Sequence, residues 1–297
     1  MDCTYKMVPP NSHNFKLMVL SGYNNSEKKL NYVYSHLYLM KRKILSLIQN
    51  IFNYLKNIYS FNPRNFMCDF ALGQINALTK VFPNVSLHCC FFHFSQAIWN
   101  NFKKNQLCGK GTYETNYELL FNIQLLCFMK RDKLQKFFKE LKKKYKDKKF
   151  KNFLNYFNIT WMGKRYPINL WNFNDIINSD ENKIKNFHFT NNLSENINRF
   201  LNSNLKRGIC SNFLFRNSIL SLIDQFDNKL INESKDIKKS SILTFYIKKN
   251  NNPSLLSKDE ISSLYTIYND IKFININKDY IELDHGEIDI IDYDDEN

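Results

Sequence analysis

The stretch that decides the fold is RNFMCDFALGQINALTKVFPNVSLHCCFFHFSQAIW, residues 64–99. It alternates short apolar, β-prone runs with segments whose apolar residues recur at helical spacing. Pro83 and Asn84 end the first helical segment. The predicted strand, helix, strand and helix cover 64–70, 71–82, 85–92 and 93–102. This order with short connections predicts a parallel α/β layer.

An acidic residue, Asp69, stands where the first of these strands ends. Ligands and metals gather at the carboxyl ends of strands in open α/β sheets, so Asp69 is a candidate site residue. Asp is also a favoured helix N-cap, and capping of the helix over 71–82 is the alternative interpretation.

The residues before this stretch predict strands and one long helix. Runs at 15–23 and 29–37 are separated by Asn24, Asn25 and Ser26, which favour a turn, and an earlier strand is expected around Asp2. An amphipathic helix is predicted over 40–59. Three antiparallel strands, a helix and then strand–helix–strand is the expected order of elements.

Composition indicates a folded, basic protein. The 297 residues are 43% hydrophobic, and 42 Lys and Arg against 28 Asp and Glu give a net charge of +14. Such an excess suits a polyanionic partner, although the abundance of Lys, Asn, Ile, Phe and Tyr also matches the bias of an AT-rich genome. No apolar run approaches the ~20 residues of a membrane span. The 7 cysteines, without paired Cys-x-x-Cys motifs, fit a reduced intracellular compartment.

The segment 104–159 predicts mostly helical structure with many lysines on its polar side. One interpretation is a helical insertion that follows a DNA backbone; the other is an ordinary solvated helical face. The cations that we single out as candidate DNA contacts are Lys130, Arg131, Lys142, Lys143 and Lys144.

Three separated motifs resemble one family. They are Asp2-Cys3-Thr4-Tyr5-Lys6, the Phe82-Pro83-Asn84 and Cys90-Phe91-Phe92-His93 pair of segments, and Thr190-Asn191-Asn192 followed by Glu195. Together they resemble, over about residues 2–230, the catalytic domain of Mutator-like element (MULE) transposases. That family is of the DDE type and related to IS256-type transposases.

The resemblance implies a ribonuclease-H-like fold: a mixed sheet of three antiparallel and then parallel strands, flanked by helices, with a basic all-helical insertion. It implies that Asp2, Asp69 and Glu195 are catalytic and hold two Mg²⁺ or Mn²⁺ ions. Taken without the resemblance, Asp2 is a solvated terminus and Glu195 an acid in the first turn of a helix. The sequence departs from the family where Cys3 replaces Gly, Phe189 replaces Arg and Asn198 replaces His.

Cys90 and His93 form a Cys-x-x-His motif. Half of a zinc site is one interpretation, but no second half has suitable spacing. A buried cysteine and a hydrogen-bonded core histidine is another. The resemblance implies that the pair helps to handle DNA near the active site.

The expected domains are a catalytic core (1–103 and 161–235), a helical insertion (104–160) and a C-terminal extension (236–297) with an acidic, weakly ordered tail. Trp161 and Trp171 are expected to pack in the core. The expected function is metal-dependent cleavage and transfer of DNA strands in the nucleus, with transposon ends and target DNA as partners. The protein is expected to form a homo-oligomer. The alternative within this expectation is that the chain is a truncated, degenerate or domesticated copy of such a transposase.

A non-catalytic DNA-binding or regulatory protein derived from a transposase is the main alternative. A helical scaffold without a nucleic-acid role and an RNA-acting nuclease on the same fold are the others.

Overall fold

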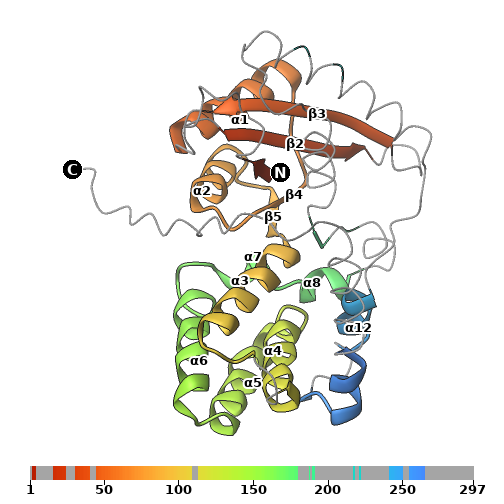
Figure 1. The fold of residues 1–297 in the computed structure, drawn as a ribbon. Helices are drawn as coiled ribbons and strands as arrows, with labels where there is room; N and C mark the ends of the chain where they lie inside the picture. Colours follow the sequence, from red (N-terminus) through yellow and green to blue (C-terminus); the bar gives the residue numbers. More distant parts are fainter. Residues whose placement is uncertain are drawn as a thin grey trace.

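The computed structural model describes residues 2–4, 16–24, 31–40, 45–108, 113–179, 187, 189–190, 217, 221, 241–249 and 254–264. These residues form an α/β part and a mostly helical part, which occupy the two halves of Figure 1. The fold class is therefore α/β with a predominance of helix.

The α/β part contains an antiparallel sheet in the order β1-β2-β3. Its strands are β1 (Asp2–Thr4), β2 (Lys16–Asn24) and β3 (Asn31–Met40). Asp2 pairs with Val19 in the first half of β2, and Lys16 pairs with Met40. Because Met40 belongs to β3, the following helix α1 (Leu45–Tyr59) begins later than the predicted position 40.

The parallel layer is confirmed. Strands β4 (Asn65–Cys68) and β5 (Ser86–Cys89) pair in parallel, with Cys68 opposite Cys89, and α2 (Leu72–Val81) connects them. The prediction that the second strand reaches residue 92 is wrong, because the helix α3 (Phe91–Lys104) already begins at Phe91.

Aromatic side chains fix α1 against this layer. Phe52 is fully buried, and its ring meets the edges of Phe66 at 5.9 Å and Phe82 at 5.8 Å. Apart from His88, the buried positions of β4 and β5 are apolar or thiol side chains, as expected for short parallel strands covered by helices.

The helix α3 joins the two parts. Its first residue follows β5, and its later residues pack among helices, where the Phe102 ring lies 5.4 Å from Phe153 and 6.3 Å from Tyr117. The predicted helical character of 104–159 is confirmed by α4 (Tyr113–Leu125), α5 (Arg131–Lys144) and α6 (Lys148–Thr160). Figure 1 shows these helices side by side below the strands.

Later segments complete the helical part. Trp161 and Trp171, the latter at the end of α7 (Ile168–Trp171), are buried as predicted. A short helix α8 (Asn174–Ile177) follows. Helix α12 (Ser241–Lys249), within the segment predicted as an extension, buries Tyr246, whose hydroxyl donates to Gln124 Oε1 at 2.9 Å.

Some predictions lie outside the described residues. These are the catalytic assignment of Glu195, the linker at 250–253, the acidic tail, and most of a helix predicted over 211–230, of which Asn217 and Ser221 are described and helical. Within the described ranges the two sheets share no strand pairing, so the single mixed sheet of a ribonuclease-H-like fold stays a prediction. A search of the described helices finds none with the length and apolarity to cross a membrane.

Candidate functional site

Asp69 lies at the carboxyl end of the parallel strands and faces a histidine. It follows Cys68, the last residue of β4, and its side chain is 14% exposed. Oδ1 of Asp69 lies 3.3 Å from Nδ1 of His93, in the first turn of α3. We call these two residues the Asp69–His93 pair. The structure thus brings together two of the residues that the sequence marked as candidates.

The local sequence explains why these residues meet. Cys90 N donates to Cys68 O at 2.9 Å and continues the ladder by one residue beyond β5. Cys90 then serves as the N-cap of α3, with an extended backbone, so His93 points back from the first turn toward the end of β4. Two adjacent strand ends place the acid and the imidazole at one edge of the sheet.

The interpretation of Asp69 as the N-cap of the following helix is wrong. The N-cap of α2 is Ala71, whose carbonyl accepts from Gln74 N and Ile75 N. Asp69 lies two residues earlier, and its carboxylate is directed to His93 instead.

The cysteines contribute packing beneath the pair. Cys90 is fully buried, so its Sγ supports α3 from within the core. Cys89 is also buried and donates to Asp69 O at 3.7 Å; burial raises the pKa of its thiol well above the ordinary value.

Aromatic residues join the site to the helical part. The Phe70 ring, next to Asp69, meets the edges of Trp161 at 4.8 Å and Tyr166 at 5.2 Å. Burial raises the pKa of Tyr166, and its neutral hydroxyl donates to Phe70 O at 2.9 Å. A contact across 96 residues therefore fixes the turn that follows α6 next to the residue after Asp69.

The same contact places near Asp69 a turn with two residues that the sequence analysis did not select. Lys164 and Arg165 are exposed on the turn between Trp161 and Tyr166. The sequence signal that could have identified them is a Gly-Lys-Arg run between Trp161 and Tyr166. Only the tertiary contact with Phe70 shows that this turn lies beside the acid.

The third motif reaches the site at its first residues. Phe91 N, at the start of α3, donates to Phe189 O at 2.9 Å, which places Phe189 and Thr190 beside β5. Phe189 is buried and packs against Phe128, Phe173 and Phe187. This apolar cluster accounts for Phe at a position where an Arg would be buried without a counter-charge.

The predicted metal ligands are not assembled within the described part of the chain. Asp2 is a strand residue, Asp69 faces His93, and Glu195 is not described. A search of the described residues finds no group of three or more His, Cys, Asp or Glu side chains able to hold a metal ion. Asp69 itself offers the hard oxygen ligand that Mg²⁺ and Mn²⁺ prefer.

The predicted DNA-contact cations lie on and before α5. Lys130 and the three lysines 142–144 are exposed. Two of the cations have acidic partners, since Arg131 lies 2.7 Å from Asp175 and Lys144 pairs with Glu118. The polar face of α5 and α6 is otherwise dominated by lysine: residues 130–151 contain twelve Lys and Arg and three acids.

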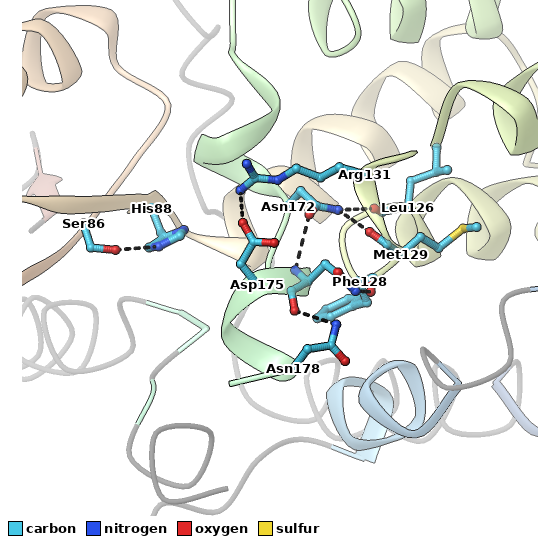
Figure 2. A network of polar contacts seen from close by, with 10 residues as sticks. Ser86, His88, Leu126, Phe128, Met129, Arg131, Asn172, Asp175 and Asn178 are labelled. Atoms are coloured by element: carbon cyan, nitrogen blue, oxygen red, sulfur yellow. Dashed lines mark hydrogen bonds and ion pairs between the residues drawn. The ribbon is translucent and has the colours of Figure 1, made fainter. Parts of the chain in front are cut away.

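A polar network fixes the junction between β5, α5 and α8 (Figure 2). Asn172 is fully buried and donates to the carbonyls of Leu126 and Met129, both at 2.9 Å, while its Oδ1 accepts from Asn174 N at 3.3 Å. In the same view His88 bonds Ser86 beside the Arg131–Asp175 ion pair. These polar residues serve structure, because they satisfy buried carbonyls at the end of α4.

A family model, the MULE transposase domain, matches residues 1–97, about a third of the chain. The match begins before β1, includes Asp2, Asp69, Cys90 and His93, and ends within α3. It shows that this part of the chain is similar to MULE transposase domains. No curated protein matches the chain.

Proposed function

We propose that this protein descends from a DDE-type MULE transposase and cuts and joins DNA strands with Asp2, Asp69 and Glu195 as catalytic acids. The observation that carries the proposal is the position of Asp69. It ends β4 beside the parallel β5, within the residues that match the transposase domain, and its carboxylate lies at the edge where α/β sheets bind ligands.

The proposed fold is ribonuclease-H-like. The order of three antiparallel strands, a helix and a parallel strand–helix–strand unit supports it. In such a sheet β1 lies next to β4, which would bring Asp2 toward Asp69 because neighbouring strands are only about 4.8 Å apart. Glu195 would approach from the segment that follows Thr190, whose neighbour Phe189 is bonded to α3.

Two Mg²⁺ or Mn²⁺ ions, when bound, would supply an activated water or 3′-hydroxyl and stabilise the departing oxygen. The chain's own residues would hold and orient the reactants. Asp69 would present a carboxylate oxygen, and the His93 ring would keep that carboxylate directed toward the first turn of α3. The buried aromatic residues behind Phe70 keep this edge of the sheet rigid.

The proposed substrate is DNA in the nucleus, bound as transposon ends and target, by a homo-oligomer. Charge supports a polyanion: the chain carries a net +14, and lysines dominate the exposed face of α5 and α6.

A non-catalytic, DNA-binding descendant of a transposase is the second candidate. The described part of the chain favours it in one respect: the Asp69 carboxylate lies against the His93 ring, and a search of the described residues finds no group of three or more His, Cys, Asp or Glu side chains able to hold a metal ion.

Nicking of end-labelled DNA by the full chain, with Mg²⁺ or Mn²⁺ and with EDTA, tests the proposal. Asp69→Asn and Glu195→Gln are each expected to reduce the rate by at least a hundredfold, since loss of one ligand of a metal pair removes several kcal/mol of transition-state stabilisation. Asp132→Asn, an exposed acid on α5, is the matched control and should keep the rate. Metal-independent nicking, or equal rates for all variants, refutes catalysis and leaves the DNA-binding candidate.

A further inference from the structure

The turn after α6 is attached beside the candidate catalytic acid. The chain leaves α6 at Thr160 and reaches α7 at Ile168. Between them, the Tyr166 hydroxyl donates to the carbonyl of Phe70, the residue that follows Asp69. The tip of this turn is formed by Lys164 and Arg165, both exposed.

Buried contacts hold the turn in one conformation. Trp171 Nε1 donates to Trp161 O at 3.1 Å and to Tyr166 O at 3.3 Å, so one indole bridges both ends of the turn. A Cβ on Gly163 would lie 2.4 Å from the carbonyl oxygen of Ile159, which means that the backbone approaches too closely for any other residue. The cations are therefore presented on a rigid support.

The two charges have no acidic partner among the described residues. Lys144, Arg131 and Lys249 each pair with a carboxylate. No described carboxylate lies within ion-pair distance of Lys164 or Arg165, and the Arg165 guanidinium lies 5.8 Å from the centre of the Tyr166 ring. Two uncompensated cations on a rigid turn beside an acidic site suit an anion that approaches the same edge of the sheet.

We propose that the Lys164–Arg165 turn binds a phosphodiester of DNA and holds it beside Asp69. The inference deepens the proposed function, because it takes DNA as the ligand. Helix α6, which ends at this turn, has 13 residues and is therefore about 20 Å long. Lysines 148, 149 and 151 are exposed at its other end. Cations separated by that length match a polynucleotide backbone rather than a single free phosphate.

The test measures DNA binding in EDTA, where no cutting occurs. Lys164→Gln/Arg165→Gln is compared with Lys133→Gln/Lys136→Gln, which removes the same charge from the exposed face of α5. Loss of two phosphate contacts should lower the slope of log K against log salt by roughly 2 and weaken binding by on the order of tenfold per contact near 0.1 M salt. The charge-keeping swap Lys164→Arg/Arg165→Lys should retain most of the affinity, and thermal melting checks that every variant is folded.

Asp69→Asn tests whether the phosphate bound by the Lys164–Arg165 turn lies beside the Asp69 carboxylate. Without metal, the Asp69 carboxylate repels a phosphate held beside it, so its neutralisation should tighten DNA binding about fivefold, the effect of one unit charge at close range in water. This gain should disappear in the Lys164→Gln/Arg165→Gln background and persist in the Lys133→Gln/Lys136→Gln background.

Equal gains in both backgrounds, or unchanged DNA affinity in Lys164→Gln/Arg165→Gln, overturn the inference. If the coupling is present but the unmodified chain shows no metal-dependent nicking, the catalytic proposal fails while the phosphate-binding turn stands. If nicking occurs without the coupling, the catalytic proposal stands and the turn is not its phosphate site.

Discussion

Acidification should destabilise this protein through one histidine. His88 lies within β5 and is 8% exposed, with its Nε2 3.1 Å from Ser86 Oγ and its ring packed between those of Phe173 and Phe187. Burial, aided by the nearby positive charge of Arg131 and opposed by Asp175, lowers the pKa of His88 to about 4.

The sign follows from the difference between the folded and unfolded states. In the unfolded chain a histidine has a pKa of about 6.5, so below that pH the unfolded state binds more protons than the folded state. The free energy of unfolding is therefore undiminished above pH 6.5, falls as the pH drops through 6.5 toward 4, and levels off below. With a folded pKa of about 4, the loss at pH 5 is about 2 kcal/mol, and at pH 4 about 3 kcal/mol.

The assay is urea unfolding at pH 7.5, 6, 5 and 4.5, with His88→Gln as the comparison. Gln keeps a polar group near Ser86 but does not titrate, so the variant should lose about 2 kcal/mol less than the natural chain between pH 7.5 and 5. Carboxylates affect both proteins equally and cancel in this difference. Parallel pH profiles would show that His88 is not held neutral by its surroundings and would refute the reasoning.

Three further substitutions test the contacts that fix the site and its support. Asn172→Asp turns an oxygen toward the carbonyls of Leu126 and Met129, so it should lower the free energy of unfolding by about 3 kcal/mol or more at pH 7. The loss should be smaller at pH 4, where the acid is protonated. Urea unfolding measures both losses, and equal losses at the two pH values would contradict the prediction. Gly163→Ala should cost about 1–3 kcal/mol in the same assay because its Cβ meets the backbone, and an unchanged midpoint would contradict the close approach. Tyr246→Ala should cost about 3–5 kcal/mol, whereas Tyr246→Phe should cost about 1 kcal/mol; a small loss in both would show that α12 adds little to the helical part.

The order of elements around the site was predictable from the sequence because it depends on local patterns. Apolar spacing between residues 64 and 104 marks β4, α2, β5 and α3, and Pro83 separates the second from the third. The residues at which these strands and helices begin and end were less predictable. Residues 90–92 look β-prone, yet Cys90 caps a helix because Phe91 N bonds Phe189 O, a partner almost a hundred residues away.

The role of Asp69 shows the same division. Taken by itself, Asp69 favoured a capping role over a site role, because Asp is a preferred residue just before a helix, and the family resemblance favoured the catalytic role. The structure decides against capping, since the N-cap is Ala71 and the carboxylate meets His93, in the first turn of the helix that follows the next strand. The proposed approach of Glu195 to Asp69 depends on long-range packing rather than on a local pattern, and it involves a residue outside the described ranges.

The sequence by itself determined the alternation of strands and helices, the excess of positive charge and the residue types suited to phosphoryl transfer. Only the tertiary structure decided which of these residues are neighbours: it joined Asp69 to His93, and it brought the Lys164–Arg165 turn to Phe70 across 96 residues. The physical reason is that periodicity and capping act over a few residues, whereas a site is made by packing, and packing selects partners by shape and burial regardless of their separation along the chain.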